Sequence, residues 1–148
     1  MREVVGDIWN FASQGWIVVT TNSVIKSDGT AVMGAGIALE AAKRFPSLPL
    51  ELASRLRNVG NCVHYFLDYK IITFPTKRHW KDKSEIDLII AGAAQLKKDL
   101  LTFRCQQRPV QYFLPRLGCG NGGLAWEDVT KAVQPYLDEP EFIFVNRS

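Results

Sequence analysis

Two glycine-rich segments carry the clearest chemical signal in this sequence of 148 residues. The first is Gly-Thr-Ala-Val-Met-Gly-Ala-Gly-Ile-Ala at 29–38, and the second is Leu-Pro-Arg-Leu-Gly-Cys-Gly-Asn-Gly-Gly-Leu-Ala-Trp at 114–126. Each follows a strand-like apolar run and leads into a helix-like one. Glycine lets the backbone turn with positive φ and approach a ligand closely, and the free N–H groups at a helix start attract anions. Together the segments predict a cleft that holds a diphosphate.

Familiar nucleotide-binding motifs do not fit these glycines. A phosphate-binding loop of the Gly-x-x-x-x-Gly-Lys-Ser/Thr type needs lysine after Gly34, where Ala35 stands. A dinucleotide-binding fingerprint that starts at Gly34 needs glycine where Leu39 stands. One glycine loop alone would more often mark a tight turn or a helix start. Two such loops in one small domain favour ligand binding.

Composition indicates one globular domain. The length fits a single domain, and 47% hydrophobic residues are enough to fill its core. The three cysteines lack Cys-x-x-Cys spacing and metal-ligand clusters are absent, so we predict no disulfide, no metal and no cofactor. Without a leader pattern or an apolar run of about 20 residues, a cytoplasmic protein without membrane contact is expected. The net charge of +3 is too small to establish nucleic-acid binding.

Alternating strand-like and helix-like segments must position the two loops. Strands are predicted at 4–5, 16–20, 62–67, 70–74, 110–114 and 142–145, and helices at 37–45, 50–59, 84–100 and 126–137. The third and fourth strands are expected to form a hairpin, residues 84–87 to form a capping box, and the last strand to lie at a sheet edge. This alternation predicts an α/β fold whose mixed, mostly parallel sheet is covered by helices on both faces. Both glycine loops then emerge at the carboxyl ends of strands.

The order of these landmarks resembles the macrodomain family, whose members bind ADP-ribose. Gly6-Asp7-Ile8, the strand end at 18–22, and the loops at 32–38 and 117–126 match the family in order over essentially the whole chain. Phe-Pro-Thr-Lys-Arg-His-Trp at 74–80 resembles the branch of the terminal ADP-ribose protein glycohydrolase and of the antitoxin macrodomain that removes ADP-ribose from thymidine in DNA. The resemblance implies a single three-layer αβα macrodomain over residues 1–148.

The resemblance also implies which residues bind ADP-ribose. Asp7 would accept a hydrogen bond from the adenine amino group, although Asp at such a junction also caps helices. Asn22 would bind hydroxyls of the distal ribose, although Asn after a strand also stabilises turns. Backbone N–H groups of the glycine loops would surround the diphosphate without a cationic side chain. The implied ligand-binding residues are Asp7, Ile8, Asn22, Val32, Met33, Gly34, Ala35, Gly36, Ile37, Thr76, Leu117, Gly118, Cys119, Gly120, Asn121, Gly122, Gly123 and Leu124.

Lys77 is the candidate catalytic residue. Residue type alone favours a solvated lysine in a basic loop, since lysine is usually exposed. The resemblance places it near the anomeric carbon of the distal ribose, where it would act either as a nucleophilic amine or as a positive charge. The rest of the segment 77–83 consists of three further basic residues, a histidine, Trp80 and an aspartate. This segment either contacts single-stranded DNA or is a solvated loop anchored in the core by Trp80.

Two features depart from the relatives. In the protein-directed glycohydrolase an aspartate of the second loop assists catalysis, and Gly122 occupies the matching position, which favours the DNA-directed activity. The stretch 23–30 is longer, and it either caps the distal ribose through Lys26 or Asp28 or forms an exposed turn. Cys119 has no His or Asp at a recognisable partner spacing, so a small buried thiol is expected rather than a nucleophile.

These features predict hydrolysis of an ADP-ribosyl bond, with a nucleobase in DNA as the leading attachment site and Lys77 as the catalytic residue. An ADP-ribose 1''-phosphate phosphatase and a non-catalytic ADP-ribose reader are the alternatives. The sequence shows no fused toxin, so an antitoxin role implies a separately encoded ADP-ribosyltransferase as partner.

Overall fold

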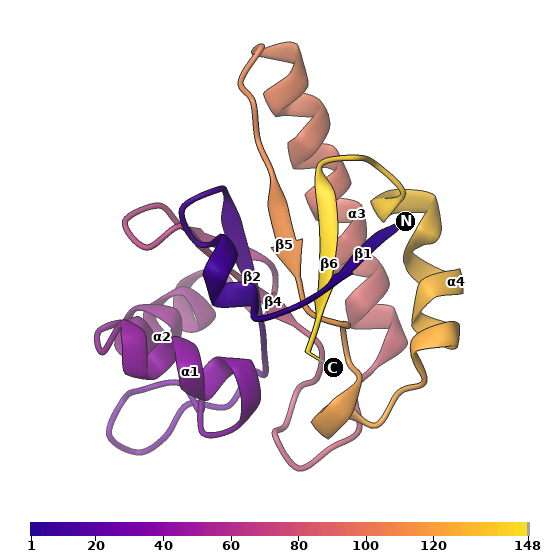
Figure 1. Cartoon of the computed structure of the whole chain (residues 1–148). Helices are drawn as coiled ribbons and strands as arrows, with labels where there is room; N and C mark the ends of the chain where they lie inside the picture. Colours follow the sequence, from indigo (N-terminus) through magenta and orange to yellow (C-terminus); the bar gives the residue numbers. More distant parts are fainter. Residues whose placement is uncertain (148) are drawn as a thin grey trace.

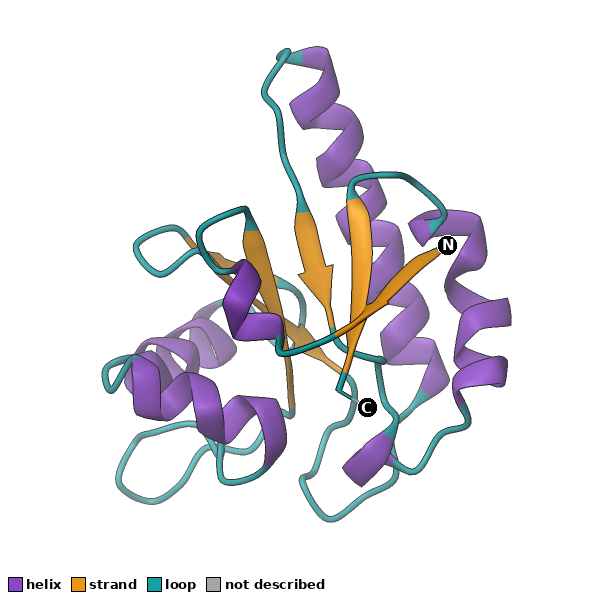
Figure 2. Cartoon of the chain, viewed as in Figure 1, coloured by secondary structure: helices purple, strands orange, loops and turns teal. Residues whose placement is uncertain are grey.

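The computed structural model describes residues 1–147 and shows one six-stranded sheet between two helical layers (Figure 1) (Figure 2). The strand order is β1-β6-β5-β2-β4-β3, and within these residues β3 alone runs antiparallel to its neighbour. The strands are β1 (Arg2–Val5), β2 (Trp16–Thr21), β3 (His64–Phe66), β4 (Ile71–Pro75), β5 (Tyr112–Leu114) and β6 (Phe142–Asn146). The α-helices are α1 (Gly36–Arg44), α2 (Leu48–Asn58), α3 (Ile86–Cys105) and α4 (Trp126–Leu137), and two short 3-10 helices are η1 (Ile8–Phe11) and η2 (Gly120–Gly122). The predicted three-layer α/β fold is confirmed.

The sheet separates two hydrophobic cores. Helices α1 and α2 with η1 cover one face, and α3 and α4 cover the other (Figure 1). Successive residues of β2 alternate between the cores: Ile17 and Val19 pack with the first, and Val18 packs with the second. Because both faces of the central strands are buried, their ends are the only places where the chain can present loops to a ligand.

Most predicted elements are confirmed to within a few residues. The helix predicted at 126–137 has those bounds, and the hairpin is present, with Tyr65 of β3 opposite Ile72 of β4. Helix α2 begins earlier than predicted, at Leu48, because Pro49 is tolerated in the first turn of a helix. None of the helices in residues 1–147 combines the length and apolarity that a bilayer crossing requires.

Two local expectations are wrong. No side chain caps α3, and the main-chain N–H of Ser84 instead donates to the carbonyl oxygen of Gly122 at 2.8 Å. The tertiary bond to the second glycine loop has replaced the local capping box. The last strand, β6, lies between β1 and β5 and is not an edge, because Arg2–Val5 of β1 adds on outside it.

Gly92 marks the tightest contact between α3 and the sheet. A Cβ added there would lie 2.5 Å from Cζ of Phe74, a fully buried residue of β4. We predict that Gly92→Ala lowers the free energy of unfolding by about 1–3 kcal/mol through overpacking, although alanine favours helices more than glycine does. Denaturant unfolding measures the change. Gly6→Ala is the control, because nothing lies within 4 Å of its added Cβ; equal stability of the two variants would contradict this packing.

Candidate functional site

A cavity of about 790 Å³ opens where the parallel strands β2, β4 and β5 end. Its walls are the end of β2, both glycine loops and the loop at 76–84 that leads into α3. It brings together most of the residues that the sequence predicted for the site. These are Asn22, Val32, Met33, Gly34, Ala35, Gly36, Ile37, Thr76, Lys77, Gly118, Cys119, Gly120, Asn121 and Gly122.

A smaller cavity of about 380 Å³ adjoins the first and shares Gly36 and Gly120 with it. Ile8 lines this second cavity. Asp7 lines neither, and its carboxylate instead accepts from the N–H of Trp9 at 3.0 Å, so the helix-capping interpretation of Asp7 is confirmed. Leu117, Gly123 and Leu124 also lie outside both linings. They belong to the turn that shapes the second loop.

Helix α1 presents its N-terminus to the large cavity. No side chain caps it and its first turn has no acidic residue. The unpaired N–H groups and the helix dipole therefore leave a partial positive charge at this wall, which suits an anion. Gly36 at the start of α1 has φ of +58°, and Gly120 across the cavity has φ of +62°. These backbone conformations favour glycine at both positions.

Asn22 holds the first loop in place at the end of β2. Its side-chain NH₂ donates to the carbonyl of Val32 at 3.2 Å, and its Oδ1 accepts from the N–H of Val24 at 2.9 Å. The turn-stabilising interpretation of Asn22 is thus confirmed. An amide group has two N–H donors and two acceptor lone pairs, so the side chain retains hydrogen-bonding capacity toward the cavity that it lines.

Lys77 lies one residue beyond Thr76, whose backbone is fixed on both sides. Thr76 N–H donates to Thr21 at 3.0 Å, and its carbonyl accepts from the N–H of Glu85 at 2.7 Å. The Nζ of Lys77 donates to the carbonyls of Trp80 and Asp82, each at 3.2 Å. The amine is therefore held by main-chain oxygens of its own loop, at the border of the cavity.

Trp80 stands at the cavity wall with 48% of its surface exposed. The imidazole of His79 stacks on it at 5.5 Å between ring centroids, and Nζ of Lys81 lies 5.1 Å from its centroid. The alternative in which Trp80 anchors the loop in the core is therefore wrong. Trp80 was predicted either to contact DNA or to anchor the loop, and its place in the lining of the cavity was not predicted.

The stretch 23–30 forms an exposed turn. Lys26 N–H donates to the carbonyl of Thr30 at 2.7 Å, and Ile25 bridges to Ala31. The side-chain and backbone hydrogen bonds from Thr30 lower the pKa of Asp28. Residues 23–30 are not part of the cavity lining. Of the two alternatives for this stretch, the structure shows the exposed turn.

Cys119 behaves as a partly buried thiol. Its Sγ donates to the carbonyl of Leu117 at 3.7 Å, and burial raises the pKa of the thiol. A raised pKa keeps the sulfur protonated near neutral pH, whereas a nucleophilic cysteine needs the thiolate. Residues 1–147 also contain no group of three or more His, Cys, Asp or Glu side chains suited to a metal.

Ser84 and Arg116 also border the cavity, although neither was predicted to be a site residue. Ser84 was assigned to a capping box, and it instead packs against Gly122, where an added Cβ would lie 2.2 Å from its Oγ. This contact leaves no room for a side chain at position 122. The Nε and NH2 atoms of Arg116 donate to the carboxylate of Glu3 at 2.9 and 2.7 Å, which lowers the pKa of Glu3. A cationic side chain thus stands where only backbone groups were predicted.

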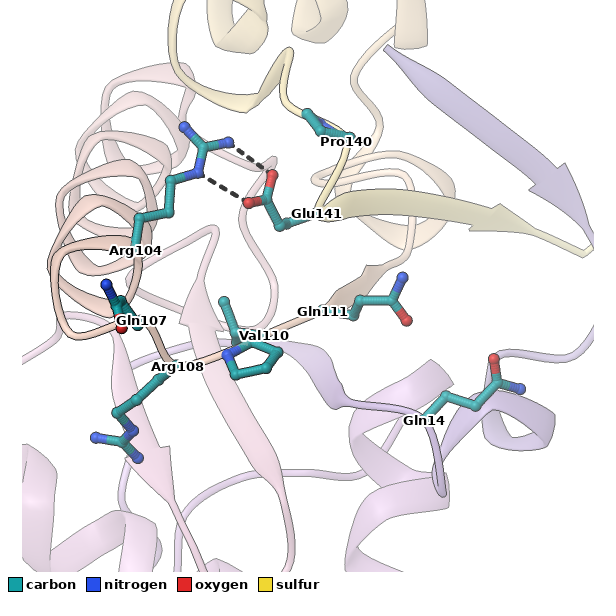
Figure 3. Close-up of a pocket in the computed structure, with 9 residues that line it drawn as sticks. Gln14, Arg104, Gln107, Arg108, Val110, Gln111, Pro140 and Glu141 are labelled. Atoms are coloured by element: carbon teal, nitrogen blue, oxygen red, sulfur yellow. Dashed lines mark hydrogen bonds and ion pairs between the residues drawn. The ribbon is translucent and has the colours of Figure 1, made fainter.

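Another hollow, of about 650 Å³, has Gln14, Gln111 and Glu141 in its lining (Figure 3). These residues precede β2, β5 and β6, so the hollow lies at the opposite end of the sheet. Arg104 donates there to the carboxylate of Glu141, at 2.8 and 2.7 Å, and to that of Glu139 at 2.6 Å. These charges satisfy one another, and none of the predicted site residues lines this hollow. The site therefore lies at the carboxyl ends of the strands.

Comparison with known proteins identifies the family. No protein-family model matches the chain. The DNA ADP-ribosyl glycohydrolase of Mycobacterium tuberculosis is 36% identical over 107 residues, which cover 66% of this chain and 29% of that protein. The protein of the same name from Thermus aquaticus is 30% identical over 138 residues, which cover 87% of this chain and 36% of that protein.

Solved structures agree with these relatives. The macrodomain of Mycobacterium tuberculosis DarG superposes with a TM-score of 0.75 at 29% identity, covering 99% of this chain and 97% of that one. The chain is a macrodomain of the DarG branch. Thermosipho africanus DarTG in complex with ADP-ribose shares the fold of this macrodomain, with a TM-score of 0.76 at 23% identity over 99% of this chain and 42% of that one. The macrodomain spans about a third of the length of its curated relatives from Mycobacterium tuberculosis and Thermus aquaticus.

A charged cluster borders the small cavity. Glu40 of α1 accepts from the indole N–H of Trp9 at 2.8 Å and from Arg147 at 3.1 and 3.2 Å, and Arg147 also lies 3.4 Å from the carboxylate of Asp7. The hydrogen bond from Arg147 is the largest cause that lowers the pKa of Glu40 from 4.5. The small cavity is therefore bordered by an ion pair that joins α1 to the end of β6.

Glu40→Gln tests this ion pair through its pH dependence. Because the pKa is lowered in the folded state, ionised Glu40 stabilises the protein above about pH 4.5, and this contribution is lost as the pH falls through the lowered pKa. We predict that the variant loses less than about 1 kcal/mol at neutral pH, since water screens a partly exposed pair. The gap to the parent should close as the pH falls through the lowered pKa of Glu40. Denaturant unfolding at several pH values measures it. Glu127→Gln is the control, as its pair with Lys131 is exposed; a gap independent of pH would contradict the assignment.

Proposed function

We propose that this macrodomain releases ADP-ribose from a nucleobase in single-stranded DNA, with the base of thymidine as the leading attachment site and Lys77 as the catalytic residue. The observation that carries the proposal is the position of Lys77 beside Trp80 at the border of a cavity built from two glycine loops. The names of the curated relatives, DNA ADP-ribosyl glycohydrolases, support the reaction and its substrate. The bound ADP-ribose of the Thermosipho africanus structure supports the ligand.

The two cavities suggest how ADP-ribose would lie. The small cavity, with Ile8 and the nearby Asp7, would take the adenine end. The diphosphate would lie between the N-terminus of α1 and the second glycine loop, where backbone N–H groups and a helix dipole favour an anion. The distal ribose would then reach Asn22, Thr76 and Lys77, which line only the large cavity.

Hydrolysis at this ribose breaks the bond from the anomeric carbon to the base nitrogen. A bond to the oxygen of water forms in its place, and a proton returns to the departing base. Lys77 can serve this reaction in two ways. A neutral amine would attack the anomeric carbon and form an adduct that water resolves, and an ammonium would stabilise charge on the leaving base. Reduction with borohydride during turnover distinguishes the two, because only the amine adduct is trapped on the protein.

Lys77→Ala is the decisive variant. We predict that release of ADP-ribose from thymidine-ADP-ribosylated single-stranded DNA falls by about 100-fold or more, in line with loss of one group that stabilises a transition state. ADP-ribose binding should stay close to that of the parent. Release is followed by separating free ADP-ribose from the oligonucleotide, and binding by calorimetry. Lys98→Ala is the control, since Lys98 is an exposed lysine of α3 that does not line the cavity.

The same measurements test the two alternatives. A parent that binds ADP-ribose but releases none from DNA, and that hydrolyses ADP-ribose 1''-phosphate with or without Lys77, would be a phosphatase. A parent that binds ADP-ribose without turnover of either substrate would be a reader. Full DNA activity in Lys77→Ala would remove the lysine from the mechanism.

We further propose that the segment 77–83 contacts the DNA strand that carries the modified base. Trp80 offers an exposed ring beside the cavity, and Lys81 lies over that ring. Aromatic stacking and backbone charge contacts are the usual means of holding single strands. Arg78, another cation of this loop, is paired with Glu85.

Lys81→Ala tests the strand contact. For an oligonucleotide substrate, kcat/KM should fall with rising salt, and loss of one phosphate contact should reduce the log–log slope by about 0.7. For an ADP-ribosylated thymidine nucleoside, which has no strand, the variant should match the parent. Lys98→Ala, an exposed lysine of α3, is the control. An unchanged salt slope in Lys81→Ala would exclude this residue from the DNA contact.

The relatives also suggest the enzyme that supplies the substrate. A Thermosipho africanus protein named DNA ADP-ribosyl transferase-DNA ADP-ribosyl glycohydrolase fusion protein is 39% identical to this chain over 70 residues. These residues cover 47% of this chain and 17% of that protein. We propose that a DNA ADP-ribosyltransferase is the functional partner of this macrodomain, producing the modified base from which Lys77 helps to release ADP-ribose.

A further inference from the structure

Ser84 carries a hydroxyl for which the fold provides no partner. The residue is only 6% exposed, and its Oγ has no hydrogen-bond partner within residues 1–147. The residue nevertheless lines the large cavity. Leaving a buried hydroxyl unpaired destabilises a protein, so such groups are uncommon unless another molecule supplies the bond.

The backbone holds Ser84 at the seam between the two parts of the site. Its N–H donates to the carbonyl of Gly122 in the second glycine loop at 2.8 Å. The next residue, Glu85, donates its N–H to Thr76, the neighbour of Lys77, at 2.7 Å. Ser84 is thereby fixed between the loop that carries Lys77 and the loop proposed to bind the diphosphate.

The neighbouring glycine makes room for this hydroxyl. A Cβ at Gly122 would lie 3.0 Å from Cβ of Ser84 and only 2.2 Å from its Oγ, and real Cβ atoms essentially never show a contact as short as the second. A Cβ at Gly118 would also come within 3.1 Å of the Ser84 Cβ. Two glycines of the second loop therefore leave the space that the serine side chain occupies.

We propose that Ser84 Oγ hydrogen-bonds the distal ribose of ADP-ribose, which makes it a substrate-contacting residue. Ser84 lines the large cavity together with Thr76 and Lys77 and does not line the small one, so it lies on the ribose side of the ligand. A staggered rotation about χ1 turns a serine hydroxyl toward a new partner without backbone movement. This assignment rests on the ADP-ribose placement of the proposed function, and not on the linkage that is cleaved.

Thr73 provides an internal comparison. Its Oγ1 is the other buried side-chain hydroxyl without a partner in residues 1–147, and Thr73 lies in β4 at 0% exposure. It borders neither cavity. Thr73 thus carries an unpaired hydroxyl away from both cavities, while Ser84 carries one in a residue that lines the large cavity.

Ser84→Ala tests the contact with two ligands, ADP-ribose and ADP, which lacks the distal ribose. Calorimetry should show ADP-ribose binding about 3- to 10-fold more weakly to the variant, the change expected for one hydrogen bond, and unchanged binding of ADP. The variant should unfold at the same or a higher denaturant concentration than the parent, because an unpaired buried hydroxyl is removed. Thr73→Val, the control of similar shape, should keep parental affinity for both ligands.

Other outcomes overturn the assignment. Unchanged ADP-ribose affinity in Ser84→Ala would show that the hydroxyl makes no ligand contact. An equal loss for ADP-ribose and ADP would show that Ser84 acts by shaping the second loop. If the parent binds ADP-ribose but releases none from DNA, the proposed reaction is wrong, and the binding measurements still test the Ser84 contact. A parent that binds neither ligand would defeat both proposals.

Discussion

Burial of the sheet on both faces is the constraint on which this molecule depends. Strands β2, β4, β5 and β6 run parallel between two hydrophobic cores, so most of their side chains are committed to packing. The chain can offer polar groups only where strands end. Because the strands are parallel, Thr21, Pro75 and Leu114 end at the same edge of the sheet. The loops that follow them must therefore share one region of space, and the large cavity lies there.

Backbone hydrogen bonds then turn these neighbouring loops into one rigid site. Thr21 accepts from Thr76, Thr76 accepts from Glu85, and the adjacent Ser84 donates to Gly122. This sequence of bonds runs from the end of β2, past Lys77, to the second glycine loop. The position of the Lys77 loop is thus set by main-chain contacts rather than by the identity of its exposed side chains. Among its basic residues, Arg78 pairs with Glu85, while Lys81 lies over the exposed ring of Trp80.

Local patterns predicted the fold and the glycine walls of the cavity, whereas Asn22, Thr76 and Lys77 were predicted from the resemblance to macrodomains. Alternating apolar segments predicted the strands and helices, and the two glycine loops predicted where the ligand would lie. What escaped prediction depends on contacts between distant residues. Ser84 fits a capping box by spacing, yet its partner is 38 positions away in Gly122. The charge of Arg116 is held by Glu3 near the other end of the chain. The edge position expected for β6 was wrong because the short β1 pairs outside it.

The lining of the large cavity has a consequence for how this protein can be inactivated. Much of the wall consists of glycine and other small residues. Gly118 and Gly122 leave space that a Cβ would fill, and Gly36 and Gly120 allow a backbone turn with positive φ. Truncating larger side chains to alanine, the usual way of finding functional residues, would miss this contribution, because glycine has no side chain to truncate. Substitution of one of these glycines by alanine adds a single methyl group, the smallest possible side chain. Such a chemically mild change should be enough to damage the site, and harmful natural variation at this wall should be of this kind.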